Sequence, residues 1–195
     1  MEEDEDKSQK IQMVAFTTNE KSQLPNDIIS HYLNHNSHFI IKRSKQLIAF
    51  SSVLPEQKKP TKIMICTIID LSLEYEGINE VNCYIIVIDL QKESSREKYI
   101  EILAYIQKHC DLSKKIYLLG IKKEDEDNKV KMSEEEIDEK IKELNLEYEY
   151  FELNTDNSME ISDKIIEIFQ YSFETNLNDD EKRHGNVDGR SCSIY

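Results

Sequence analysis

Two nearly unbroken apolar runs limit most strongly what this chain of 195 residues can fold into. The segments KIMICTIIDL (62–71) and CYIIVIDL (83–90) are rich in Ile and Val and lack the polar alternation of a half-exposed strand. Runs of this kind form strands that are buried on both faces, as in parallel sheets flanked by helices. The chain therefore predicts an α/β fold.

Strand-like and helix-like segments alternate along the rest of the chain. The predicted strands are KIQMVAF (10–16), HFIIKR (38–43), QLIAFSSVL (46–54), KIYLLGI (115–121) and YEYFELN (148–154), of which the second and third read as an edge or hairpin pair. The predicted helices are PNDIISHYLNH (25–35), SSREKYIEILAYIQKHC (94–110), SEEEIDEKIKEL (133–144) and MEISDKIIEIFQYSF (159–173). Ile100, Leu103 and Ile106 have helical spacing in the second of these, and Ser133 with Glu136 predicts a capping box in the third.

Charge and composition exclude several classes of function. The net charge of -14 argues against nucleic-acid binding. No run approaches the length of a membrane span, and MEEDEDKSQ is the reverse of a basic, apolar signal peptide, which predicts a cytoplasmic protein. Cys66, Cys83 and Cys110 form no C-x-x-C pair, and the first two read as small buried hydrophobes.

The chain divides into one domain and two tails. Residues 1–9 are expected to form an acidic flexible tail, and 10–173 a single domain of ordinary size. Residues 174–195 turn polar and predict a flexible C-terminal tail ending in CSIY.

In a parallel sheet, ligands bind beyond the carboxyl ends of the strands, which directs attention to four loop segments. They are AFTTNEKS (15–22), TIIDLSL (67–73), LLGIKKE (118–124) and FELNTD (151–156). In order, spacing and length, the segment from about Lys10 to Phe173 resembles the small GTPases of the Ras and Rab type. The resemblance implies a small-GTPase-like (P-loop NTPase) domain with a mostly parallel six-stranded sheet and helices on both faces. It also implies a site for GTP or GDP with magnesium.

The first of these loops departs from the phosphate-binding pattern G-x-x-x-x-G-K-S. Lys21 and Ser22 are present, but Ala15 and Glu20 stand where the two glycines belong. Glycine is needed there because the backbone must wrap the phosphates closely with positive φ. A carboxylate about 4 Å from a phosphate charge would also cost roughly 4 kcal/mol at an effective dielectric constant near 20. The loop is therefore predicted to have lost phosphate binding.

The other motifs of the family are also incomplete. Asp70 and Lys122 occupy their family positions, and Glu124 replaces an aspartate that would read the guanine base. The remaining departures are Leu73 for glycine, Ile121 for asparagine and Asp156 for lysine. If nucleotide is bound, the positions that would hold it are Lys21, Ser22, Asp70, Lys122 and Glu124.

These residues also have ordinary structural interpretations. Lys21 and Ser22 fit a polar turn that starts a helix, and Asp70 fits a turn after a strand, as does Asp89. Lys122 lies in a charged run typical of solvated surface.

Two further features suggest other chemistry. Cys192 stands in a terminal Cys-a-a-X box whose prenylation would give membrane contact, with a chance cysteine as the alternative. His31, His35 and His38 could share a helix face, but no set of other ligands accompanies them, so no metal site is predicted.

The leading hypothesis is a catalytically inactive pseudo-GTPase without cofactor. It would act as a protein-binding scaffold or structural subunit of a cytoplasmic assembly of the trafficking, cytoskeletal, ciliary or kinetochore kind, consistent with reuse of the fold without its site. The expected partner surfaces are the former switch region 38–60 and the acidic segment 124–139. The alternative is a divergent, prenylated GTPase that binds GTP or GDP with magnesium and switches effectors at a membrane.

Overall fold

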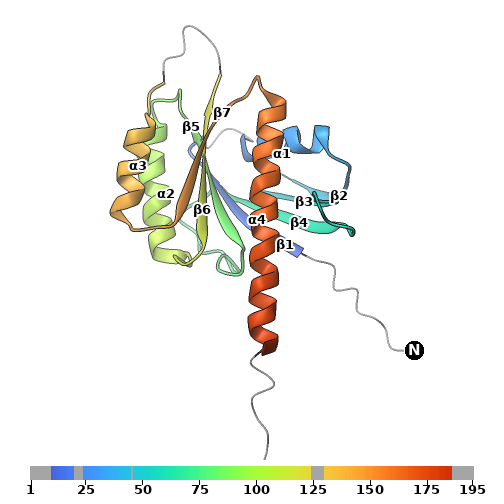
Figure 1. The fold of residues 1–195 in the computed structure, drawn as a ribbon. Helices are drawn as coiled ribbons and strands as arrows, with labels where there is room; N and C mark the ends of the chain where they lie inside the picture. Colours follow the sequence, from blue (N-terminus) through green and yellow to red (C-terminus); the bar gives the residue numbers. More distant parts are fainter. Residues whose placement is uncertain (1–9, 20–23, 45, 124–129, 186–195) are drawn as a thin grey trace, which may run out of the picture.

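The computed structural model describes residues 10–19, 24–44, 46–123 and 130–185, with side chains described as far as Thr175 (Figure 1). The strands are β1 (Lys10–Thr17), β2 (His38–Arg43), β3 (Leu47–Ser52), β4 (Thr61–Ile68), β5 (Cys83–Asp89), β6 (Lys115–Lys122) and β7 (Tyr148–Asn154). The helices are α1 (Leu24–His35), α2 (Ser95–His109), α3 (Glu134–Glu143) and α4 (Ser158–Gly185). The α/β fold and the predicted order of elements are confirmed.

The strands form one mostly parallel sheet in the order β2-β3-β4-β1-β5-β6-β7. Strands β4, β1, β5, β6 and β7 are parallel to their neighbours within this set, and β2 and β3 are antiparallel at one edge. The sheet has seven strands, not the six that we expected, because both members of the hairpin pair join it. Strand β2 pairs with β3 although all its residues are exposed, so backbone hydrogen bonds place it there without burial.

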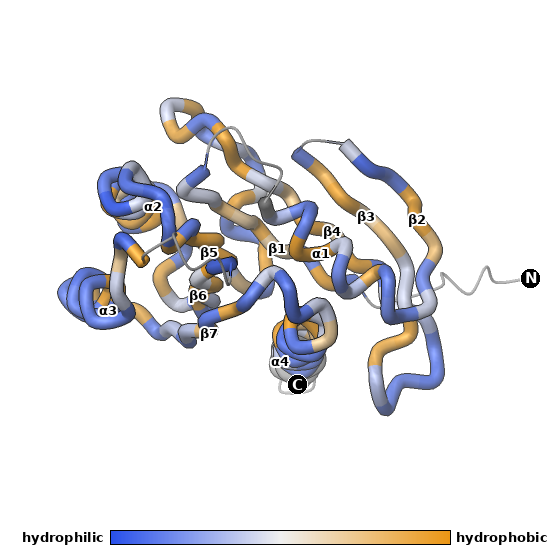
Figure 2. Tube along the Cα trace, turned by 90° about the horizontal axis from the view of Figure 1, so that it is seen from above, coloured by the Kyte–Doolittle hydropathy of each residue, from blue (hydrophilic) through white to orange (hydrophobic). Residues whose placement is uncertain are grey.

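Two apolar layers hold helices against the sheet, one on each face. On one face, α1 and α4 pack on β1, β3 and β5 through a cluster that includes Tyr32, Phe50 and Phe169. On the other face, α2 and α3 pack on β5 and β6 around Tyr84 and Tyr99. Figure 2 shows α2 and α3 gathered over one half of the sheet, away from β2 and β3. The strands under the helices are therefore buried on both faces, as their composition predicts.

The helices confirm some details of the sequence pattern and correct others. The capping box of α3 is present, because the Ser133 hydroxyl accepts from Glu136 N–H and the Glu136 carboxylate accepts from Ser133 N–H. In α2, Leu103 and Ile106 are buried as expected, but Ile100 is 47% exposed. The buried stripe of α2 is turned toward Tyr99, which occupies the preceding position.

The closing helix α4 is longer than the sequence suggested. We expected the chain to leave the domain after Phe173, but α4 continues to Gly185. Residues 174–185 contain no proline, and their only glycine is the last residue. Since extending an existing helix costs far less than nucleating one, the polar continuation remains helical beyond the part that packs on the sheet.

Candidate functional site

The carboxyl ends of the parallel strands meet at a shallow cleft of about 320 Å³. Its lining comes from the ends of β5, β6 and β7 and the loops that follow them, and includes Asp89, Lys92, Lys122 and Thr155. This is the position at which an α/β sheet offers a ligand site. Whether it can hold a phosphate depends on the end of β1 and on the groups that surround the cleft.

Strand β1 runs through the place where a phosphate-binding loop would begin. Ala15, which replaces the first glycine of the pattern, lies inside the strand and pairs with Thr67 of β4 and Ile85 of β5. It is 1% exposed, and the next residue, Phe16, is fully buried. The apolar character of these two side chains keeps the chain in the sheet through Thr17.

The first amides after β1 are occupied by other parts of the protein. The Thr18 N–H donates to the Val87 carbonyl over 3.0 Å, which extends the pairing of β1 with β5. The Asn19 N–H donates to the Thr17 hydroxyl over 3.1 Å. A phosphate-binding loop works by presenting such N–H groups to the ligand. The N–H groups of Thr18 and Asn19 instead donate to acceptors within the protein.

Side chains complete the closure of the strand end. The Thr18 hydroxyl lies 2.9 Å from the Ser95 hydroxyl and accepts the Asp89 N–H over 3.0 Å. The Asn19 amide donates to Asp89 Oδ2 over 3.2 Å, and its oxygen accepts from Lys92 Nζ over 2.9 Å. These bonds tie β1, β5 and α2 together, and they occupy polar groups that could otherwise meet a ligand.

Asp70 is placed in a local turn after β4. One of its carboxylate oxygens accepts the Ser72 N–H over 2.9 Å and the Ser72 hydroxyl over 2.6 Å. These two hydrogen bonds hold the pKa of the Asp70 carboxyl below its usual range. The turn interpretation of Asp70 is confirmed, and Asp89 behaves in the same way by accepting the Gln91 N–H.

Lys122 lies at the end of β6, and its Nζ forms an ion pair with the carboxylate of Glu152 on the neighbouring strand β7. The next residue, Lys123, exchanges two hydrogen bonds with the Gln91 side chain through its backbone. Asp156, in the last family motif, is exposed and donates its N–H to the Asn154 side chain. The Lys122 side chain, which the resemblance assigns to base recognition, thus makes a contact between the neighbouring strands β6 and β7.

Four of the predicted site residues, Lys21, Ser22, Glu124 and Cys192, lie outside the described residues, as does the segment 124–129. Of the predicted nucleotide positions, the structure therefore places Asp70 and Lys122, which follow β4 and end β6. The sheet separates these two strands by β1 and β5. Lys122 lines the cleft; the residues that line it do not include Asp70.

The three histidines of the sequence pattern make hydrogen bonds: His31 and His35 bond from α1 to α4, whereas His38 lies in β2 and bonds locally. His31 and His35 each have a ring nitrogen 2.9 Å from the Ser158 hydroxyl at the start of α4, and His38 bonds to the Asn36 carbonyl. Among the described residues, no cluster of His, Cys, Asp and Glu could hold a metal ion. In that same part of the chain no helix is long and apolar enough to cross a membrane.

Sequence reasoning missed the residues that matter most at the strand end. The sequence pattern assigns no role to Thr18, Asn19, Gln91 or Lys92, and it places Ser95 only near the start of the predicted helix 94–110. The polar pair Thr17–Thr18 directly after an apolar strand was the available signal, because buried hydroxyls require partners. Nothing in the sequence indicates that the partner lies 77 residues away.

The chain was compared with protein-family models and with curated proteins. No family model matches the chain, and no curated protein matches it.

Proposed function

We propose that this chain is a small-GTPase-like protein that binds no nucleotide and serves as a scaffold or structural subunit in a cytoplasmic protein assembly. The order of elements supports the likeness: a strand, a helix, a hairpin pair and a buried strand precede three strand-helix units. The sheet is mostly parallel, with helices on both faces. In such a protein the fold remains as a framework, and function depends on surfaces added to it.

One observation carries the proposal, and it lies at the end of β1. The strand continues through Ala15, and the N–H groups of Thr18 and Asn19 bond to Val87 and Thr17. A nucleotide would need these amides turned outward around its phosphates. Turning these amides outward would break the hydrogen bond that ends the pairing of β1 with β5, and would therefore destabilise the folded domain.

The charged groups of the cleft support the same conclusion. Asp89 lines the cleft, and its negative charge would repel a phosphate bound there. Two of the lysines that line the cleft already make contacts within the protein: Lys92 donates to Asn19, and Lys122 forms an ion pair with Glu152. An anionic ligand would have to compete with these contacts, which lowers its net gain on binding.

The first experiment is a search for nucleotide in the natively purified protein. The protein is denatured, and the released small molecules are separated by chromatography; we expect neither GDP nor GTP. A fluorescent GTP analogue with magnesium is then titrated into fresh protein, and we expect no binding at high micromolar concentration.

Unfolding provides an independent readout. A ligand present at 100 times its dissociation constant stabilises the folded state by about 2.7 kcal/mol. GTP with magnesium should therefore leave the urea midpoint unchanged if it does not bind. Stoichiometric GDP, or a raised midpoint, would contradict the proposal and favour the divergent GTPase that switches effectors.

The expected partner surfaces are 38–60 and the acidic segment 124–139. In the described part of the second segment, α3 begins with Glu134, Glu135 and Glu136, and Val130 is 49% exposed. Affinity capture from cell extract with the wild-type chain, followed by mass spectrometry, should return a reproducible partner that added GTP or GDP does not displace. Displacement by GTP would contradict the proposal.

A further inference from the structure

Within the described part of the chain, strand β2 forms one edge of the sheet and has no strand on its outer side. It pairs with β3 on one side only, and all six of its residues are exposed. Its centre is apolar, with Phe39 72%, Ile40 37% and Ile41 48% exposed. A long apolar edge with unpaired backbone groups invites a further strand, and proteins without such a use usually protect it.

The opposite edge of the sheet is protected in the expected way. Strand β7 is mostly half-buried, and its Glu149 and Glu152 form ion pairs with Lys115 and Lys122 of the neighbouring strand. Charged residues of this kind oppose pairing with other chains. The apolar exposure of β2 is thus specific to one edge.

The strand register shows on which face of the sheet each β2 side chain lies. Phe39 lies opposite Ser51, which in turn lies opposite Lys62 of β4. After a bulge between Ile40 and Lys42, Lys42 lies opposite Ala49, on the same face as Phe39. Arg43 lies on the other face and donates to the Ser30 hydroxyl of α1 over 2.9 Å.

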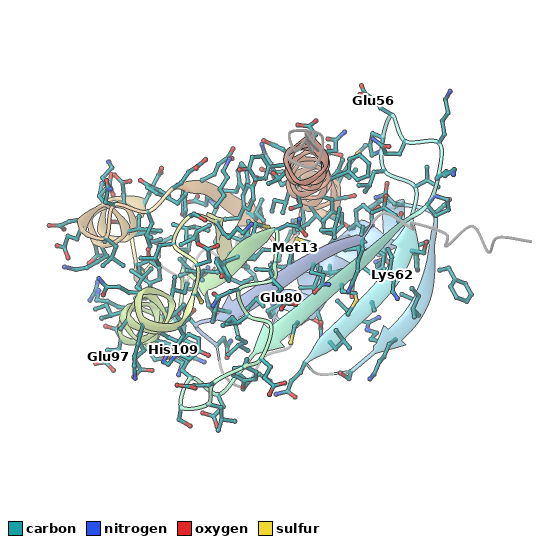
Figure 3. All side chains as sticks on the ribbon, turned by 90° about the horizontal axis from the view of Figure 1, so that it is seen from below. Met13, Glu56, Lys62, Glu80, Glu97 and His109 are labelled. Atoms are coloured by element: carbon teal, nitrogen blue, oxygen red, sulfur yellow. The ribbon has the colours of Figure 1, made fainter. Side chains whose placement is uncertain are left out.

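None of the four described helices covers the face that holds Phe39 and Lys42. We call it the open sheet face and define it by Phe39, Lys42, Leu47, Lys62, Met64 and Cys66, all exposed or half-buried. Figure 2 shows α2 and α3 on the other half of the sheet, and Figure 3 shows the labelled Lys62 over the uncovered strands. At its far end, Met64 and Cys66 line a groove of about 160 Å³ beneath the turn at Tyr75–Ile78.

This part of the molecule is basic, in contrast to the chain as a whole. Residues 38–62 contain six Lys and Arg and one acidic residue, which gives +5, whereas the whole chain carries -14. Among the described residues, Lys42, Lys58 and Lys62 have no ion pair. Unpaired cations beside an apolar strand attract an acidic partner and disfavour a basic one.

We propose that the outer edge of β2, with the open sheet face beside it, is the docking site for an extended acidic segment of a partner protein, which adds to the sheet as a further strand. Main-chain hydrogen bonds would hold such a segment in place, and side chains on alternate faces would select it. This inference rests on the proposed scaffold function and names the chemistry of its partner.

The order of residues in β2 predicts the order in the partner. Along β2 three apolar residues, Phe39, Ile40 and Ile41, precede the cations Lys42 and Arg43. An antiparallel partner strand would therefore read two acidic residues followed by three apolar β-formers, and a parallel one the reverse. Either order places carboxylates opposite the cations and apolar side chains opposite Phe39.

A second copy of this chain fits the same edge poorly. In a parallel pair, Lys42 would lie beside Lys42 of the other copy. In an antiparallel pair centred on Ile40, Lys42 of one copy would lie opposite His38 of the other and Arg43 opposite Ser37, so no carboxylate would meet either cation. Both arrangements leave the basic charges unpaired, so an acidic partner is favoured.

The test uses the full chain and fluorescein-labelled probe peptides. Two short peptides contain Glu-Asp-Val-Ile-Val or Val-Ile-Val-Asp-Glu between Ser and Thr residues, and we expect one of them to bind by fluorescence anisotropy. A peptide with Lys in place of the acids, and one with Pro in place of Ile, should not bind, because the first reverses the charge and the second blocks strand pairing.

Matched variants locate the site. Lys42→Glu should raise the dissociation constant of the peptide roughly tenfold or more, since an attraction becomes a repulsion. Lys108→Glu makes the same charge change at an exposed position of α2 and should have little effect. Phe39→Ala should weaken binding several-fold without changing the urea midpoint, because Phe39 is 72% exposed.

Hydrogen exchange tests strand addition itself. The peptide should slow amide exchange in residues 38–43, where outward N–H groups gain partners. Equal binding of the Lys peptide, equal effects of Lys42→Glu and Lys108→Glu, or unchanged exchange in β2 would each overturn the proposal.

Two results would assign the edge to another occupant and also overturn it. One is a dimer in sedimentation that dissociates on Phe39→Glu, which indicates a second copy. The other is slow amide exchange of β2 in the free chain that becomes fast when the acidic residues at 2–6 are changed to the corresponding amides. That result would indicate that the chain's own N-terminal segment occupies the edge. Failure of peptide binding without bound nucleotide refutes this inference alone, whereas bound GDP refutes the scaffold function.

Discussion

The hydroxyl groups of Thr18 and Ser95 lie 2.9 Å apart in the interior, one just after β1 and the other at the start of α2. They are 2% and 0% exposed. The Thr18 hydroxyl also accepts the N–H of Asp89, so one side chain joins two strands and a helix at the strand end. This bond occupies the region from which a phosphate-binding loop would extend.

We expect the two hydroxyls to differ in their effect on stability. Thr18→Val removes the partner of both Ser95 and the Asp89 N–H, and should lower the free energy of unfolding by about 2–3 kcal/mol. Ser95→Ala leaves the bond from Asp89 intact and should cost about 1 kcal/mol. Urea unfolding of both single variants and the double variant measures their coupling. Equal costs for the two single variants would show that the Asp89 bond contributes nothing.

Restoring glycine to the phosphate-loop pattern should not restore nucleotide binding. Ala15→Gly combined with Glu20→Gly recreates the two glycines, but β1 still pairs with its neighbours through Thr17. Because Ala15 is a buried strand residue, its change to Gly should cost roughly 1 kcal/mol. Titration of fluorescent GTP with magnesium, beside urea unfolding, checks both expectations. Micromolar GTP binding by the double variant would show that Ala15 and Glu20 alone prevent nucleotide binding in the wild-type chain.

Gly120 is required because Tyr150 lies against it. A Cβ at Gly120 would stand 2.6 Å from the Tyr150 hydroxyl oxygen and 3.1 Å from Leu90 Cδ1. Gly120→Ala should therefore destabilise the protein by about 1–3 kcal/mol through overpacking. The same change in a Tyr150→Phe background should cost less, since the closest atom is gone. Thermal or urea unfolding of the four proteins gives the comparison; equal costs in both backgrounds would assign the strain to Leu90 and to Cε2 of the aromatic ring at position 150, which also stands 3.1 Å from the added Cβ.

The start of α3 should give the protein a small acid sensitivity. The N–H of Ser133 and the guanidinium of Arg96 hold the pKa of the Glu136 carboxyl below its ordinary value near 4.5. A lowered folded-state pKa stabilises the protein above about pH 4.5, and this stabilisation is lost as the pH falls through the folded-state pKa. Glu136→Gln should lower the urea midpoint at neutral pH, and its difference from wild type should shrink near pH 3. A difference that does not change with pH would exclude the charge as its cause.

Short-range patterns were enough to predict much of the fold. Continuous Ile and Val runs predicted β4, β5 and β6, and the spacing of Ser133 and Glu136 predicted the cap of α3. These features depend on residues close in sequence. The failures were of other kinds: the burial of Ile100, the end of α4 and the number of strands depend on which neighbours the folded chain brings to each segment.

The candidate site was predicted less completely. Asp70 takes the turn role that its position after a strand suggests, because its hydrogen bonds reach only two residues along the chain. The partner of Lys122 is Glu152, and that pairing exists only because β6 and β7 are neighbours in register. Sequence spacing contains no information on such register.

The sequence by itself determined the α/β class and the order of its elements, because the period of apolar residues decides which segments can be buried as strands or helices. The missing glycines likewise follow from the sequence alone. Only the tertiary structure decided that β1 extends through Ala15, that Thr18 meets Ser95, and that β2 is left as an exposed apolar edge. Each of these depends on contacts between segments far apart in the chain, which form only when the sheet assembles in one order and one register.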